Sequence, residues 1–183
     1  MSIRDALRTA YNAAADEREA SSLQPWKAAE RERYLDLLKA EGAETLLEVG
    51  AGTGVMGRSF ADNGLRVVAT DLSPVMVEHC RAKGLEAYEM EFLNLKFDEP
   101  FDAVFGMNCL LHVPRSELPA SLEAIASCLK PGGVAYLGQY GGIDREGPWD
   151  DDHYEPNATS PTQPTRRCRR LQRSSSRYST SVQ

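Results

Sequence analysis

A short apolar run that ends in glycines is the feature that most constrains the fold of this chain. Residues 45–49, Thr-Leu-Leu-Glu-Val, are followed directly by residues 50–54, Gly-Ala-Gly-Thr-Gly. A run of this length and composition predicts a strand that is buried on both faces. The sequence after it alternates between helical and strand patterns. We therefore predict an α/β fold with a mostly parallel sheet whose strands are joined by right-handed helical crossovers.

The predicted elements follow one another closely. Helices are expected over 3–20, from Pro25 to near Gly42, and over about 54–63, 74–83 and 117–129. Further strands are expected over 65–70, 86–90, 101–106 and 134–139. Ser73 as N-cap, Pro74 at the first helical position and Gly84 at the end mark the helix at 74–83 clearly. Ligands of such sheets bind beyond the carboxyl ends of the strands, which is where we look for a site.

Length and composition predict one soluble domain. The chain has 183 residues, and no stretch approaches the roughly 18 uncharged apolar residues of a membrane span. The first twenty residues contain Arg, Asp and Glu where a signal peptide would be apolar, so we expect a cytoplasmic protein without membrane contact. The cysteines lie far apart without C-x-x-C spacing, which predicts reduced thiols and neither a metal site nor a disulfide framework: Cys80, Cys109, Cys128 and Cys168.

The net charge of −6 hides an asymmetry along the chain. Six of the 21 basic residues and none of the 27 acidic residues lie in 157–183, so residues 1–156 hold 15 basic residues against 27 acidic ones. A body this acidic repels nucleic-acid phosphates and anionic membranes. We therefore expect no nucleic-acid partner for the body of the protein.

The glycine-rich turn favours a ligand with positive charge. Glycines after a buried strand let the backbone approach a ligand, whose polar groups meet free N–H groups at the start of the next helix. A dinucleotide motif needs its third glycine at position 55, which is Val55, and Glu48 would oppose a pyrophosphate. An NAD(P)-dependent oxidoreductase is therefore disfavoured. A cationic or zwitterionic ligand suits Glu48 better.

Four motifs in order resemble class I S-adenosylmethionine-dependent methyltransferases, over about residues 44–142. They are Glu48 to Gly54 after the first strand, Asp71 closing the second, Glu91-Phe92 after the third, and Leu-Lys-Pro-Gly-Gly at 129–133. The Asn-Cys-Leu-Leu-His-Val-Pro segment at 108–114 is similar to that of small stand-alone bacterial methyltransferase domains. The resemblance implies a Rossmann-like fold, with S-adenosylmethionine as cofactor. It also implies methyl transfer by in-line displacement.

The resemblance also implies roles for individual residues. Asp71 would accept the ribose hydroxyls, while Leu72 packs on the adenine. Glu91, where the family more often has Asp, would accept a hydrogen bond from the adenine amino group, with Phe92 beside the ring. Glu48 would orient the loop or the ligand's ammonium group. The full set implied to bind the cofactor is Glu48, Gly50, Ala51, Gly52, Gly54, Asp71, Leu72, Glu91, Phe92 and Asn108. The competing interpretation is a tight turn followed by an N-capping acid.

The acceptor should lie next to the segment that leaves the fourth strand. His112 is the candidate catalytic residue, because an imidazole that titrates near neutrality can take a proton from an acceptor amine or hydroxyl. A capping or packing role is its alternative. We interpret Cys109 as a small core residue rather than a nucleophile. Tyr11 and Trp26 are candidates for a lid over the donor, or for packing on the sheet. The acidic body favours a small-molecule acceptor.

The sequence divides into four parts: N-terminal helices that form a lid or cap at 1–43, a methyltransferase core at 44–142, an acidic and aromatic extension at 143–156, and an Arg/Ser-rich tail at 157–183. The tail has too few apolar residues to fold and is predicted to be disordered. Class I methyltransferases normally continue with strands that complete a seven-stranded sheet. Arg-Arg-Cys-Arg-Arg beside Ser-Ser-Ser-Arg is typical of a GC-rich gene read out of register, and permitted codons from Asn157 give a helix followed by a strand in another frame. We therefore hypothesise a frameshift near residue 157.

Two alternatives follow from the tail. One is an ordinary basic, disordered tail that contacts nucleic acid or membrane. The other is a truncated pseudoenzyme that binds S-adenosylmethionine without catalysis. The oligomeric state and the acceptor do not follow from the sequence.

Overall fold

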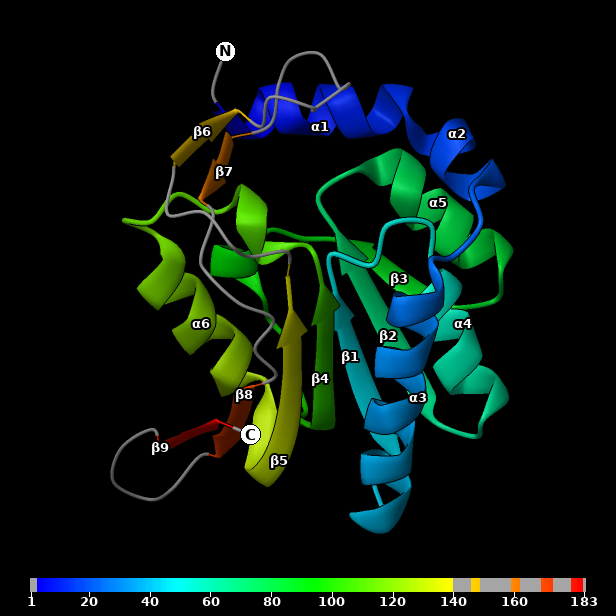
Figure 1. Cartoon of the computed structure of the whole chain (residues 1–183), viewed down its shortest axis with the longest axis vertical. Coiled ribbons are helices and arrows are strands. Elements are labelled where there is room, and N and C mark those ends of the chain that lie inside the picture. Colours follow the sequence, from blue (N-terminus) through cyan, green and yellow to red (C-terminus); the bar gives the residue numbers. More distant parts are fainter. Residues whose placement is uncertain (1–2, 140–145, 149–158, 162–168, 173–178, 183) are drawn as a thin grey trace.

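A five-stranded parallel sheet forms the centre of the protein (Figure 1). The computed structural model describes residues 3–139, 146–148, 159–161, 169–172 and 179–182. The strand order is β3-β2-β1-β4-β5, with β1 (Thr45–Val49), β2 (Arg66–Asp71), β3 (Glu86–Glu89), β4 (Phe101–Met107) and β5 (Leu129–Gly138). The predicted α/β fold with a parallel sheet is confirmed. The described sheet has fewer than the seven strands usual in the family that the sequence resembles.

Helices cover both faces of this sheet. One apolar cluster joins it to α3 (Pro25–Ala40), α4 (Val55–Asp62) and α5 (Pro74–Ala82), and a second joins it to α6 (Leu118–Ser127). Side chains alternate between the two clusters along β1, because successive residues of a strand point to opposite faces. Leu46 belongs to the first cluster, whereas Leu47 and Val49 belong to the second. Glu48 therefore faces the side of α3, α4 and α5.

The N-terminal helices α1 (Ile3–Ala13) and α2 (Ala15–Ala20) cross the carboxyl ends of the strands (Figure 1). Polar pairs connect them to the core. Ser73 Oγ lies 2.6 Å from Asn12 Oδ1 in α1, and Lys83 Nζ lies 2.6 Å from a carboxylate oxygen of Glu19 in α2. Two turns of 3-10 helix lie at the same edge, η1 (Phe92–Asn94) and η2 (Leu110–His112). These connections fix the two helices above the edge where a ligand is expected.

Most predicted elements agree with the structure to within one or two residues, and β5 is the main exception. It begins at Leu129, five residues before the predicted start, and contains the Pro-Gly-Gly segment at 131–133. The register with β4 shifts between Phe101 and Ala103, and Gly132 has a φ of +83°. The segment predicted as a turn before the strand is thus a bulge inside it, which a glycine in a left-handed conformation permits.

Four short strands follow β5, and within the described residues they pair with one another and not with the five-stranded sheet. Antiparallel pairing joins β6 (Glu146–Pro148) to β7 (Thr159–Pro161) and β8 (Arg169–Gln172) to β9 (Ser179–Val182). Most of the predicted extension and tail lies outside the described residues, so tail disorder and the frameshift stay predictions. Within the described part, no helix combines the length and the apolar composition that crossing a bilayer requires.

Candidate functional site

The glycine turn between β1 and α4 has the backbone conformation that the sequence predicts. Gly50 and Gly52 have φ values of +62° and +56°, in the region that favours glycine. A Cβ atom at position 50 would lie 2.3 Å from Cys109 Cβ, so only glycine fits there. A Cβ atom at position 52 would meet nothing within 4 Å. The turn therefore leaves open space beside Gly52.

Asp71, at the carboxyl end of β2, holds this turn in place. One of its carboxylate oxygens accepts the N–H of Gly52 at 2.8 Å, and the other accepts the N–H of Ser73 at 2.9 Å. Burial raises the pKa of Asp71, and the backbone N–H groups of Ser73 and Gly52 oppose that rise. The side chain thus joins the glycine turn to the start of α5, where Ser73 caps the helix by accepting the N–H of Met76 at 3.1 Å.

Glu48 is the most deeply buried acid near this turn. The residue is 3% exposed, and Oε2 has no hydrogen-bond partner among the described residues. Burial raises the pKa of Glu48 to about 8, a backbone hydrogen bond from Gly57 opposes the rise, and the nearby charge of Asp71 adds to it. A Cβ atom at position 57 would lie 2.3 Å from Glu48 Oε2. Gly57 in the first turn of α4 is therefore what makes room for the carboxyl group.

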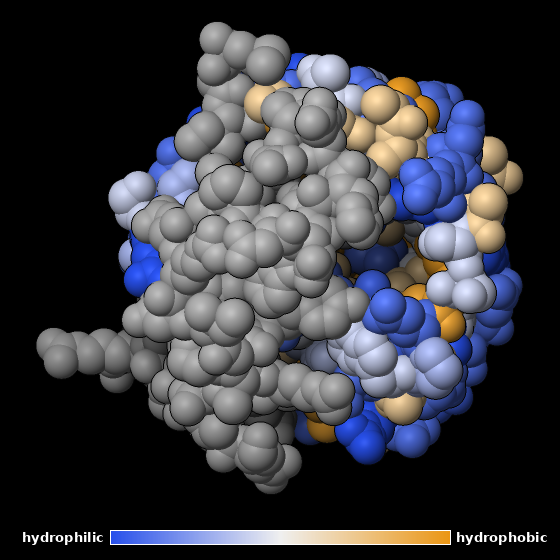
Figure 2. Space-filling model, turned by 45° about the horizontal axis from the view of Figure 1, so that its top comes forward, coloured by the Kyte–Doolittle hydropathy of each residue, from blue (hydrophilic) through white to orange (hydrophobic). Residues whose placement is uncertain are grey.

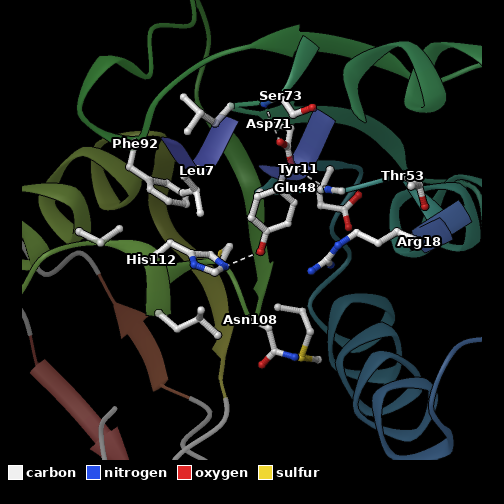
Figure 3. A pocket seen from close by; sticks show the side chains of 18 of the residues that line it. Leu7, Tyr11, Arg18, Glu48, Thr53, Asp71, Ser73, Phe92, Asn108 and His112 are labelled. Carbon is white, nitrogen blue, oxygen red and sulfur yellow. Dashed lines mark hydrogen bonds between the residues drawn. The ribbon is translucent and has the colours of Figure 1, made fainter. Parts of the chain in front are cut away.

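A cavity of about 1090 Å³ opens at the carboxyl ends of the strands, beneath α1 and α2 (Figure 3). On the outside, Figure 2 shows a largely hydrophilic described surface that is hollowed on this face. Ten predicted site residues line the cavity: Glu48, Gly50, Ala51, Gly52, Asp71, Leu72, Glu91, Phe92, Asn108 and His112. Gly54 does not line it. A Cβ atom there would lie 2.8 Å from Cys80 Sγ, so Gly54 serves close packing against α5.

The outer wall of the cavity combines an acid with an aromatic ring. Glu91 follows β3, and Arg4 Nε of α1 lies 3.5 Å from one of its carboxylate oxygens. Arg4 also pairs with Glu117, which precedes α6. Phe92 begins η1 and packs against the α6 side of the core. An ion pair to the N-terminal helix therefore anchors the predicted adenine-binding acid, while Phe92 offers a ring beside it.

A tyrosine from α1 meets the candidate catalytic histidine inside the cavity (Figure 3). Tyr11 OH lies 2.5 Å from His112 Nε2, and Arg18 Cζ lies 4.5 Å from the centre of the Tyr11 ring. Burial, assisted by Arg18, lowers the pKa of His112 to about 3. The expectation that this imidazole titrates near neutrality is therefore wrong. His112 is a neutral ring at physiological pH, which positions hydrogen bonds but takes up a proton poorly.

Comparison with known proteins places this site in a family. A family model described as a methyltransferase domain matches residues 46–133. Cypemycin N-terminal methyltransferase from Streptomyces sp is 41% identical over 99 residues, which cover 51% of this chain and 40% of that protein. Ubiquinone biosynthesis O-methyltransferase from Xylella fastidiosa is 36% identical over 100 residues, which cover 50% of this chain and 40% of that protein. The chain thus spans about two fifths of the length of these curated relatives.

The structure of DhpI in complex with SAH superimposes with a TM-score of 0.67 and 25% identity, covering 89% of this chain and 81% of that one. The core is a class I S-adenosylmethionine-dependent methyltransferase domain. All four motifs that carry the resemblance lie within the matched residues. The first three lie at the carboxyl edge of the sheet, whereas residues 129–133 begin β5 at the opposite edge. The predicted family and its fold are confirmed.

The methyltransferase domain also has cavity residues that sequence reasoning missed. Four of them are basic and come from the N-terminal helices: Arg4, Arg8, Arg18 and Lys27. Arg4 and Arg8 are one helical turn apart in α1, a spacing that indicates a basic stripe but not the partner that it meets. Gly57 was missed as well. Its signal is a fourth glycine three residues after Gly54.

Other predicted residues have structural rather than chemical surroundings in the methyltransferase domain. Cys109 is buried in the core, as predicted, and it also lines the cavity. Burial raises the pKa of its thiol to about 12, which disfavours the thiolate form. Trp26 is not among the residues that line the cavity, and its indole N–H donates to Gln24 Oε1 at 2.7 Å. The three cysteines of the described part are free thiols. Among the described residues, no group of three or more His, Cys, Asp or Glu side chains is arranged to hold a metal ion.

Proposed function

We propose that this protein transfers a methyl group from S-adenosylmethionine to a small-molecule acceptor. One observation carries the proposal: the glycine turn after β1, Asp71 after β2 and Glu91-Phe92 after β3 line a single cavity, in the order in which an extended nucleoside would meet them. The family match and the similarity to DhpI with SAH support it.

The nucleoside end fits the acids of β2 and β3. Each carboxylate oxygen of Asp71 accepts one backbone N–H, and a carboxylate oxygen has two acceptor positions, so each retains capacity for a ribose hydroxyl. Glu91 has the same spare capacity for an exocyclic amino group, while Arg4 restrains its side chain. Phe92 and Leu72 supply the apolar surface on which a purine packs.

The amino-acid end fits the glycine turn and the N-terminal helices. The space beside Gly52 lets a ligand lie against the backbone. The buried Oε2 of Glu48 lacks a hydrogen-bond partner among the described residues, so it can accept a hydrogen bond from a cationic group. Arg18 from α2 and Lys27 from the first turn of α3 bring positive charge into the same cavity, where they suit a carboxylate.

When bound, the donor supplies a methyl group on a sulfonium, an activated leaving group. The protein's task is then to align the acceptor and exclude water. Tyr11 and His112 suit that task, because their mutual hydrogen bond fixes both side chains inside the cavity. A neutral His112 offers a hydrogen bond to the nucleophilic atom without adding positive charge next to the sulfonium.

A small acceptor agrees with the charge of the body, because residues 1–156 hold 15 basic residues against 27 acidic ones. The helices α1 and α2 line the cavity, and its volume of about 1090 Å³ lies just above the range of roughly 300–1,000 Å³ that is usual for small-molecule sites. We include in the proposal a soluble, cytoplasmic protein that needs no nucleic-acid partner.

The test uses the purified full chain. Calorimetry with SAH and with NAD measures donor binding, and release of SAH from S-adenosylmethionine is then followed with a panel of phenols, carboxylic acids and amines. We expect one SAH bound per chain, no binding of NAD, and turnover with at least one acceptor. Binding without turnover across the panel would favour the pseudoenzyme alternative. Absence of SAH binding would refute the proposal.

A further inference from the structure

Ser121 is a buried hydroxyl residue on the core face of α6. It is 1% exposed, and Ile125, one turn later on the same face of the helix, is fully buried in the apolar core. Ser121 also lines the cavity, whereas Ile125 does not. The core face of α6 thus changes from apolar to polar at the turn where the helix meets the cavity.

The Ser121 hydroxyl has no hydrogen-bond partner among the described residues. A serine inside a helix often donates to a carbonyl group of the preceding turn. Ser127, in the same helix, does so, because its Oγ donates to the Ala124 carbonyl at 2.7 Å. Since a buried hydroxyl without a partner is unfavourable, Ser121 is a candidate to bind a group that enters the cavity.

Ser121 lies at the end of the cavity where the adenine-binding residues are predicted. Arg4 links the two sides of this end, because its guanidinium pairs with Glu91 and also with Glu117. Glu117 is one helical turn before Ser121, whose N–H donates to the Glu117 carbonyl at 2.9 Å. Phe92 packs on the same apolar cluster as α6, and this helix contacts η1. Glu91, Phe92 and Ser121 therefore line the same end of the cavity.

We propose that Ser121 is a further cofactor-binding residue, whose hydroxyl donates a hydrogen bond to an adenine ring nitrogen next to the amino group, N1 or N7. This inference rests on the proposed function, in which Glu91 accepts a hydrogen bond from that amino group. A carboxylate accepts and a hydroxyl can donate, so the two side chains match adenine, whose amino group donates while the neighbouring ring nitrogens accept. Hypoxanthine places an oxo acceptor against the Glu91 carboxylate and is disfavoured.

The empty and the occupied site differ for this hydroxyl. In the protein without ligand, Ser121 Oγ has no partner among the described residues, so removing it deprives no described donor or acceptor of a hydrogen bond. With a purine bound, the hydroxyl gains an acceptor. The net contribution of such a neutral hydrogen bond corresponds to about three- to tenfold in affinity. We therefore expect Ser121→Ala to weaken cofactor binding without lowering the melting temperature of the ligand-free protein.

Calorimetry with the purified full chain tests this assignment. The ligands are SAH and three analogues in which N1, N3 or N7 of the adenine is replaced by C–H. In wild type, the N1 or the N7 analogue should bind about three- to tenfold more weakly than SAH. In Ser121→Ala, SAH should weaken by a similar factor, whereas that analogue should bind as it does to wild type. The N3 analogue should lose affinity in the variant as SAH does.

Ser127→Ala is the matched control, because it removes a hydroxyl of the same helix that already donates to Ala124. This variant should bind all the ligands as wild type does. Thermal unfolding without ligand verifies that each variant is folded.

Several results would overturn the inference while SAH still binds. In wild type, N1 and N7 analogues that bind as tightly as SAH would do so whether or not the Ser121 variant folds. An equal loss for all the ligands in Ser121→Ala would mean that no ring nitrogen is involved, and a loss that disappears only with the N3 analogue would contradict the proposed position. A lower melting temperature with unchanged SAH affinity would assign the hydroxyl to the fold. If SAH does not bind wild type, the proposed function fails and this inference fails with it.

Discussion

The two ends of the sheet hold their acids in opposite ways. At the carboxyl end, Glu48 is buried, one of its oxygens has no partner among the residues that the structure describes, and burial raises its pKa to about 8. At the amino end, Asp102 of β4 accepts the Thr45 N–H at 2.9 Å and the Thr45 hydroxyl at 2.8 Å, and pairs with Lys130 Nζ at 2.8 Å. Burial alone would raise the pKa of Asp102, but these partners outweigh it and lower the pKa to about 2.

Under the proposed function, this difference separates a residue that stabilises the fold from one that meets a ligand. Asp102 joins the starts of β1, β4 and β5, so its interactions are complete before any ligand binds. Glu48 lies on the neighbouring strand β1, and its Oε2 has no hydrogen-bond partner within the described part of the chain. Natural proteins often depart from optimal stability at functional sites, and here the departure lies at the carboxyl ends of the strands.

The largest expected effect concerns Glu48→Gln in the protein without ligand. The folded-state pKa of about 8 lies above the unfolded value near 4.3, so folding takes up a proton between these limits and stability falls as pH rises. Relative to the Gln variant, wild type should lose about 1.4 kcal/mol per pH unit, or about 4 kcal/mol between pH 5 and pH 8. Urea unfolding at four pH values measures this slope.

Asp102→Asn is the matched control for that slope. Asp102 is already ionised in the folded and unfolded states throughout pH 5–8. The free energy of unfolding of Asp102→Asn should therefore change with pH in parallel with that of wild type over this range. Parallel curves for wild type and Glu48→Gln would show that Glu48 is ionised in the folded protein at pH 5, and would remove the contrast between the two ends.

Asp71→Ala should weaken SAH binding about 100-fold, equivalent to about 2.7 kcal/mol. The substitution removes the acceptor for the Gly52 and Ser73 N–H groups and, under the proposed function, the partner of the ribose. Asp71→Asn keeps one oxygen and should lie between the Ala variant and wild type. Calorimetry with SAH measures the affinity, and thermal unfolding verifies that each variant is folded. An unchanged affinity in a folded Ala variant would disprove this placement of the ribose.

Local patterns predicted the elements and the outline of the site. The apolar run at 45–49 and the capped helix at 74–83 are each specified by neighbouring residues, so their predicted bounds needed little correction. The position of Asp71 followed in the same way, because the end of a strand places its last side chain at the edge of a parallel sheet. The binding roles themselves stay predictions.

What sequence could not predict depends on partners distant along the chain. Nothing near His112 indicates that Tyr11, 101 residues away, covers it and that burial lowers its pKa. Asp102 and Lys130 are 28 residues apart in the sequence and pair at the start of β5. The Pro-Gly-Gly pattern in that strand predicted a turn, whereas the structure has a bulge there. The space that Gly57 leaves for Glu48 likewise requires α4 to be placed on the sheet first.

Gly57→Ala tests how tightly the carboxyl end is packed around Glu48. The added Cβ atom would lie 2.3 Å from Glu48 Oε2, so one of the two groups must move. Overpacking costs about 1–3 kcal/mol, and better helix propensity returns about 1 kcal/mol, so we expect a net loss of about 1–2 kcal/mol in urea unfolding. In a Glu48→Ala background the clash with Oε2 is absent, and the nearest remaining atom is Leu85 Cδ1 at 3.1 Å, so the same substitution should stabilise by less than about 1 kcal/mol. The same sign in both backgrounds would contradict this packing.

The smallest effect is expected at the amino end, for Asp102→Asn. The folded pKa of about 2 lies below the unfolded value near 3.9, so the stabilisation is fully present above about pH 4 and disappears as pH falls toward 2. Since the Lys130 side chain is 43% exposed and solvent screens the pair, we expect a loss of only about 1 kcal/mol at pH 7.

High salt separates the two kinds of partner that Asp102 has. Concentrated NaCl should weaken the contribution of exposed Lys130, while the shorter-range hydrogen bonds from Thr45 persist. The difference between wild type and Asp102→Asn in urea unfolding at pH 7 should therefore shrink in 1 M NaCl without vanishing. A difference that stayed constant from pH 7 to pH 2 would mean that the charge of Asp102 contributes nothing, and that the two ends of the sheet differ only in hydrogen bonding.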